Sequence, residues 1–197
     1  LSVLKMLFAT DWLPKLFALM KNVIGKKMIN TQINIDIAEG GWLDELPNIE
    51  KISEDIFAKV IAELNPEWLN GKKSVSCNLA LSNDEEIRQL NSEFRHLDKP
   101  TNVLSFANLD DEEFESYLKR NDEIELGDII VALQTMLVQS DDQGLSLHDH
   151  YCHILIHGIL HLLGYDHIDA EEAKEMEGEE IRLLKIFGIS NPYEENL

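Results

Sequence analysis

The stretch H-G-I-L-H-L-L-G-Y-D-H, residues 157–167, constrains the fold of this chain more than any other. Six of the seven histidines lie in it or within the ten residues before it. On a helix, His157 and His161 are four residues apart and project from the same face, one turn apart. Gly164 can adopt the left-handed conformation that ends a helix, and the turn brings His167 toward the same point. The spacing therefore predicts a helix and a tight turn that hold three imidazoles around one metal ion.

Three neutral imidazoles leave a fourth coordination position open, as in a catalytic rather than a structural zinc site. The same spacing occurs in the metzincin proteases, H-E-x-x-H-x-x-G-x-x-H. Gly158 stands where those proteases have their catalytic glutamate, which argues against peptide hydrolysis because the general base is missing. We predict one Zn²⁺ ion bound by His157, His161 and His167, and we keep a metalloprotease as an alternative.

The composition predicts one globular domain of 197 residues, of which 44% are hydrophobic. Cys77 and Cys152 form no C-x-x-C pair, so we expect small buried thiols in a reducing compartment. The formal net charge is −20, and an acidic chain is not an obvious partner for nucleic acid. If RNA binds, a local patch and the metal must attract it against the overall field.

Residues 1–27 differ from the rest because they carry five lysines and one aspartate among apolar residues at a helical period. They lack the uninterrupted apolar run of about 18 residues that a transmembrane helix requires. Three interpretations stay open, namely a membrane-surface helix, a targeting segment, and an extension translated from a start site placed too early. The extension is favoured because the chain begins with Leu1 and Met28 directly precedes a convincing strand. We expect residues 28–197 to form a single metal-dependent hydrolase domain without stable membrane association.

Hydrophobic periodicity predicts an α+β fold with elements of both kinds along the chain. Alternating apolar residues predict strands at 33–37 and 75–81, Pro100 leads into a short strand at 102–106, and E-L-G-D-I-I-V predicts a fourth at 125–131. Helices are predicted at 49–64, 82–94, 132–142, 146–163 and 169–187. Capping patterns open three of the helices, at Ser82 with Glu85, Ser146 with Asp149, and Asp169 with Glu172. The acidic segment 110–125 predicts a solvated surface loop. We expect a mixed sheet of about four strands, helices on both sides, and the zinc-binding helix packed centrally.

Three sequence blocks occur in a fixed order, F-R-H-L-D-K-P-T-N-V-L-S-F at 94–106, L-G-D-I at 126–129, and the histidine stretch. Together they resemble the YbeY family of bacterial metal-dependent endoribonucleases over about residues 28–193. The resemblance implies a zinc-dependent, single-strand-specific endoribonuclease that acts in late processing of the 3′ end of small-subunit ribosomal RNA and in ribosome quality control. It also implies ribosomal RNA and the small ribosomal subunit as partners, in the cytoplasm. A ribosome-assembly binding factor with a structural zinc is a further alternative.

The functional arginine of that family matches Arg95, whose guanidinium can hold a phosphate through two hydrogen bonds. The competing interpretation of Arg95 is a surface salt bridge to one of the many acids. We assign catalytic roles to Arg95 and His157, and substrate binding to Arg95 together with Lys99, Asn102 and Ser105 of the same block.

Three further residues are candidates for groups that support the metal ligands or transfer protons. His153 precedes the first ligand by one turn, and Asp166 directly precedes the last. Asp166 is equally well explained by an Asx hydrogen bond that shapes the turn. Asp128 can orient a ligand histidine through its free ring N–H, or can cap the end of its strand. No residue stands out as the general base, so the attacking group is either metal-bound water or a ribose hydroxyl.

Overall fold

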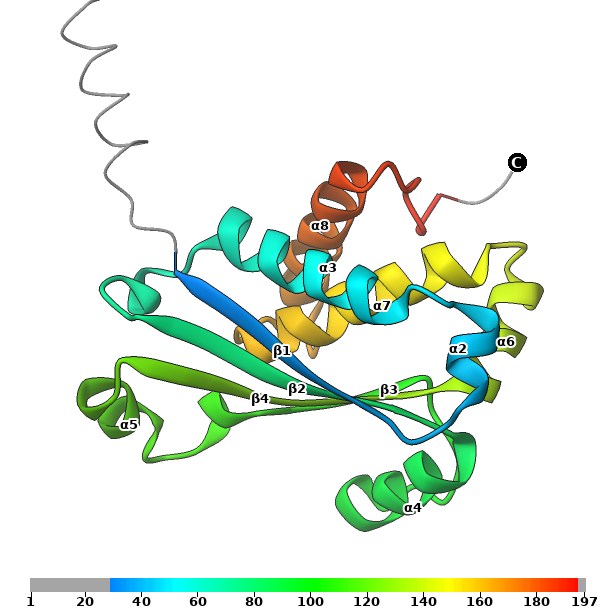
Figure 1. The fold of residues 1–197 in the computed structure, drawn as a ribbon, viewed down its shortest axis with the longest axis horizontal. Helices are drawn as coiled ribbons and strands as arrows, with labels where there is room; N and C mark the ends of the chain where they lie inside the picture. Colours follow the sequence, from blue (N-terminus) through cyan, green and yellow to red (C-terminus); the bar gives the residue numbers. More distant parts are fainter. Residues whose placement is uncertain (1–28, 195–197) are drawn as a thin grey trace, which may run out of the picture.

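The computed structural model describes residues 29–194, which form a four-stranded sheet and the helices around it (Figure 1). The strands are β1 Asn30–Ile37, β2 Ser74–Ser82, β3 Val103–Ala107 and β4 Glu123–Ala132. The helices are α2 Gly41–Glu45, α3 Ile49–Leu64, α4 Asp84–Arg95, α5 Phe114–Arg120, α6 Leu133–Asp142, α7 Leu147–Leu162 and α8 Ala170–Ile186, with short 3-10 turns at Glu67–Leu69 and Asn108–Asp110.

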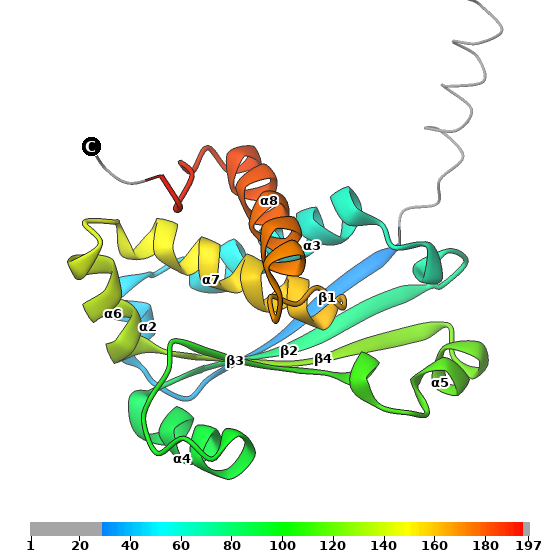
Figure 2. The same ribbon diagram turned by 180° about the vertical axis from the view of Figure 1, so that it is seen from behind.

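The sheet has the strand order β1-β2-β4-β3, in which β1, β2 and β4 are parallel and the edge strand β3 is antiparallel to β4. Helices α3 and α7 cover one face, α8 crosses over α7, and α4 lies on the opposite face (Figures 1 and 2). The predicted α+β fold, with a mixed sheet of four strands and helices on both sides, is confirmed.

Helix α7 lies between the sheet and α8, so that most of its circumference is buried (Figure 2). Its apolar residues fill the core, and each buried leucine or isoleucine contributes about 1.5–3 kcal/mol. The helix begins where the Ser146 hydroxyl accepts a hydrogen bond from the Asp149 N–H at 3.0 Å. It ends at Gly164, whose φ of +93° turns the chain back. The central position predicted for this helix is confirmed.

Strand β4 contains a bulge at Gly127 that changes which residues face the core. Between two pairs of aligned residues, β4 has one more residue than β2. Before the bulge, Ile124 and Leu126 belong to the buried core; after it, Ile129 and Val131 belong to the same core. In a regular strand, Asp128 would face the core in step with Ile124 and Leu126. Because of the bulge, it points to the opposite face of the sheet.

Two local predictions were wrong. The N-cap of α4 is Asn83, which accepts a hydrogen bond from the Glu86 N–H at 3.0 Å; Ser82 is still part of β2 and donates to the Glu86 carboxylate. The acidic segment 110–125 is not one solvated loop, because it contains α5 and the buried ring of Phe114, which contacts Trp68 edge-on.

The predictions for residues 1–27 lie outside the described residues. Among residues 29–194, no helix is both long enough and apolar enough to cross a membrane.

Candidate metal centre

Three histidines converge at the C-terminal end of α7. His157 and His161 lie on α7, and the turn at Gly164 returns the chain so that His167 reaches them. One ring nitrogen of each histidine lies within 4.8 Å of those of the other two, and the Nε2 atoms of His157 and His161 are 3.1 Å apart. Two nitrogens at about 2.0–2.1 Å from a tetrahedral zinc would be about 3.3 Å apart, so the observed spacing fits one ion.

The protonation state of the cluster also fits a metal. Burial, with smaller contributions from His157 and His167, lowers the pKa of His161 to about 4. The imidazole of His161 is therefore neutral near pH 7, as a metal ligand must be. The donor set of three imidazoles suits zinc among the divalent ions.

His157 is held from the side opposite His161 by Glu180 of α8. The Glu180 carboxylate accepts hydrogen bonds from Nδ1–H of His157 and Nε2–H of His153, both at 2.8 Å, and from the Tyr193 hydroxyl. Burial alone would raise the pKa of Glu180, but these hydrogen bonds lower it to about 2. His153, predicted to support the ligands, is linked to His157 through this carboxylate.

The histidines line a cavity of about 550 Å³ together with residues of the 94–106 block. Arg95, at the end of α4, faces this cavity and forms none of the ion pairs found among residues 29–194; its helix neighbour Arg88 pairs with Glu85 and Asp98. The structure therefore argues against the interpretation of Arg95 as a partner in a surface salt bridge. A free guanidinium beside the three imidazoles is suited to bind an anion.

The other residues assigned to substrate binding divide into two groups. Asn102 and Ser105 line the cavity, and Lys99 does not. Asn102 is held in place because its Oδ1 accepts from the Val103 N–H and its amide donates to Gln139. The Ser105 hydroxyl is buried against Gly158 of α7 and has no hydrogen-bond partner within residues 29–194, so it is an unsatisfied polar atom at the edge of the site. The main-chain carbonyl of Lys99 accepts a hydrogen bond from the buried Asn91 of α4, which does not line the cavity either.

Asp166 lines the same cavity, and its Oδ1 accepts a hydrogen bond from the His167 N–H at 2.8 Å. The donor is the N–H of the next residue, whereas an Asx turn uses the N–H two residues on, so the contact is not an Asx turn. It fixes the backbone just before the third histidine.

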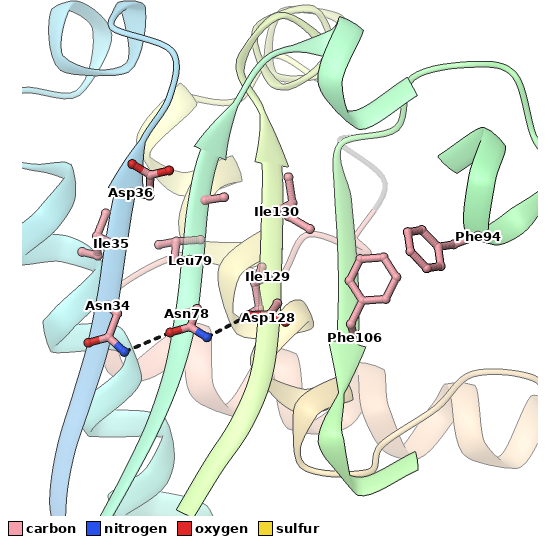
Figure 3. Close-up of a pocket in the computed structure, with 11 residues that line it drawn as sticks. Asn34, Ile35, Asp36, Asn78, Leu79, Phe94, Phe106, Asp128, Ile129 and Ile130 are labelled. Atoms are coloured by element: carbon pink, nitrogen blue, oxygen red, sulfur yellow. Dashed lines mark hydrogen bonds between the residues drawn. The ribbon is translucent and has the colours of Figure 1, made fainter. Parts of the chain in front are cut away.

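Asp128 does not support the histidines, which corrects the prediction that it orients a ligand. Because of the bulge at Gly127, its carboxylate lies on the face of the sheet opposite α7 and accepts from Asn78 at 2.8 Å. Figure 3 shows this face, where Asn34, Asn78 and Asp128 form a chain of hydrogen bonds across three strands beside Phe94 and Phe106. The carboxylate beside the histidines is Glu180 instead.

Gly158 lies where α7 approaches the sheet most closely. A Cβ atom there would be 3.1 Å from Ile129 Cγ2 and 3.2 Å from Ser105 Oγ. A longer side chain would point into the sheet and not toward the metal. The position that holds the catalytic glutamate of metzincins is therefore closed here for a steric reason.

His150, earlier on the same helix, gives the protein a predictable sensitivity to acid. It is buried, its Nε2 is 3.1 Å from the Gln139 amide oxygen, and burial, with a smaller contribution from His153, lowers its pKa from 6.5 to about 4. The unfolded chain takes up a proton below about pH 6.5 while the folded chain does not, so stability is complete above that pH and falls toward pH 4. Between pH 7 and pH 5, the metal-free wild type should lose about 1–2 kcal/mol more than His150→Gln in urea unfolding. An equal loss in both proteins would contradict the prediction.

The sequence did not reveal that Glu180 and Tyr193 belong to the site. The available signal was a glutamate in the inward-facing stripe of the last helix, next to Met176, Ile181 and Leu184. A buried glutamate requires a hydrogen-bonding partner, but periodicity does not say which.

Comparisons with known proteins agree with the three sequence blocks. The sequence profile described as Endoribonuclease YbeY matches residues 44–188. A relative named Endoribonuclease YbeY from Paramagnetospirillum magneticum is 39% identical over 168 residues, which cover 85% of this chain and 98% of the relative. One of the same name from Francisella philomiragia is 47% identical over 59% of this chain and 72% of its own. The solution structure of a Thermotoga maritima protein matches with a TM-score of 0.51 and 27% identity, over 80% of this chain and 90% of that one. The chain therefore belongs to the Endoribonuclease YbeY family.

Proposed function

We propose that this protein is a zinc-dependent, single-strand-specific endoribonuclease that acts in late processing of the 3′ end of small-subunit ribosomal RNA and in ribosome quality control. The observation that carries the proposal is the placement of His157, His161 and His167 in one cavity with Arg95, which has no acidic partner among the described residues. A metal site beside a free guanidinium suits a phosphodiester. The name shared by the relatives supports RNA as the substrate.

When bound by the three histidines, zinc supplies Lewis-acid chemistry and lowers the pKa of a coordinated water. The other tasks belong to side chains of this chain. Arg95 binds a non-bridging phosphate oxygen and compensates the negative charge that develops on the oxygen atoms around phosphorus. Asn102 is rigidly held at the wall of the cavity, and Ser105 lines the same wall. Asp166 holds the turn that carries His167.

The alternatives have less support. A metalloprotease is disfavoured because Gly158 packs against Ile129 and Ser105, which leaves no room for the missing glutamate. A binding factor with a structural zinc would need a closed site with four protein ligands, whereas the cluster has three histidines and faces a cavity.

We further propose that residues 28–197 act as a single hydrolase domain in the cytoplasm, with ribosomal RNA and the small ribosomal subunit as partners. Residues 1–27 are proposed as an extension that the metal centre does not require.

The test is cleavage of a single-stranded RNA oligonucleotide, compared with the duplex of the same sequence, before and after a chelator and after zinc is added back. Arg95→Ala should reduce the cleavage rate about 100- to 1,000-fold because it removes a charge-stabilising donor. Arg88→Ala is the matched control, since it lies on the same helix and removes the same charge but is paired with Glu85 and Asp98. It should leave cleavage within about twofold of wild type, because exposed pairs contribute little.

Cleavage that resists the chelator and is equal in wild type, Arg95→Ala and His157→Ala would come from a contaminating nuclease and would refute the proposal. Zinc-dependent turnover of a peptide library, lost in His161→Ala, would instead favour the protease.

A further inference from the structure

Glu180 is a buried carboxylate that contacts the histidine cluster without belonging to it. Its side chain is 1% exposed, and both oxygens are engaged: Oε1 with His157 Nδ1 and Oε2 with His153 Nε2, each at 2.8 Å. The Tyr193 hydroxyl donates to Oε2 as well. No lysine or arginine within residues 29–194 pairs with it. A buried anion without a cationic partner is costly, so its hydrogen bonds must compensate.

The contact with His157 determines which ring nitrogen is free to bind a metal. An ionised carboxylate can only accept hydrogen bonds, so Nδ1 of His157 must carry the proton. The lone pair of the neutral ring is then on Nε2, the atom that lies 3.1 Å from Nε2 of His161. The carboxylate thus selects the tautomer and also fixes the plane of the ring, since its second oxygen is held by His153 and Tyr193.

We propose that Glu180 is a positioning residue of the metal centre. It presents Nε2 of His157 to the ion, and it thereby sets the affinity of the three-histidine site for a zinc-like divalent cation. The inference rests on the proposed function only in taking His157, His161 and His167 as the ligands, and it holds whatever substrate the centre serves.

The first experiment measures the zinc affinity of the full chain by competition with a chromophoric chelator. Glu180→Gln keeps the size of the side chain but replaces the anionic acceptor with a neutral one. The amide group of the glutamine then lies against His153 and Tyr193. Zinc affinity should fall about 10- to 100-fold. Glu177→Gln removes the same charge from the exposed side of α8 and should stay within about twofold of wild type.

The second experiment needs no variant, and so remains decisive if Glu180→Gln folds poorly. In the metal-free wild type, ¹⁵N chemical shifts of the His157 ring should show the proton on Nδ1. A third measurement does use the variants: after cobalt substitution, the visible absorption spectrum should change in Glu180→Gln and not in Glu177→Gln, because a merely structural glutamate would leave the ligand geometry intact.

Equal zinc affinity of Glu180→Gln and wild type, or a proton on Nε2 of His157 in the metal-free protein, would overturn the inference. If the wild type does not cleave RNA while the difference in zinc affinity persists, the proposed function fails and the role of Glu180 stands.

Discussion

Replacing His161 with alanine should remove the metal and reduce RNA cleavage at least about 100-fold, while the fold is retained. His161 supplies one of three imidazoles, and two ligands cannot hold zinc against dialysis as three can. Even removing a group that only supports a ligand costs about 10- to 100-fold in metal affinity or activity, so a lost ligand must cost at least as much. The structural cost is small, since the ring of His161 is only half-buried and lines a cavity.

Metal content after dialysis, measured by atomic emission, and the initial rate of cleavage test this prediction. His148→Ala is the control, because it removes the same side chain from the same helix at an exposed position, where the ring is in polar contact with Asp149 and the Cys152 thiol. It should keep one metal ion per chain and full activity. Stoichiometric zinc in His161→Ala would show that the ion is held by other groups.

Replacing Gly127 with alanine should destabilise the protein by about 3 kcal/mol or more. The residue has a φ of +130°, which an L-amino acid rarely adopts, and a Cβ atom would lie 2.0 Å from the main-chain oxygen of Phe106. Backbone on the neighbouring strand cannot move aside as a flexible side chain can. Relief of the clash would separate β3 from β4 and displace Ser105 from the cavity.

Urea unfolding of both proteins measures this effect. Gly178→Ala is the matched control: it makes the same change on α8, where a Cβ atom would meet nothing within 4 Å. It should stabilise the protein by up to about 1 kcal/mol, because alanine favours a helix over glycine. A Gly127→Ala protein as stable as wild type would mean that the bulge can relax without cost.

The parts of the site that depend on local geometry could be predicted from the sequence. His157 and His161 share a helix face because of a spacing of four, and a glycine after the helix was enough to predict that His167 returns to them. The two strands at 33–37 and 75–81 followed from alternation, which depends only on successive side chains.

The parts that depend on packing between distant segments could not be predicted. The direction of Asp128 follows from the bulge at Gly127 in the pairing of β4 with β2, and periodicity along one strand carries no such information. Glu180 reaches His157 because α8 crosses α7 at one particular place. In α5, a single buried ring, Phe114, was hidden within a strongly acidic segment.

The bulge in β4 also determines which residues of the strand serve each face of the sheet. Ile129 and Val131 support the helix that carries the histidines, while Asp128 and Ile130 belong to the surface on the other side of the sheet. A substitution at one position therefore does not change which side chains the next position tolerates. In a mutational scan along β4, substitutions that disturb the helix side and substitutions that disturb the outer surface should alternate residue by residue. This alternation should shift by one residue at Gly127.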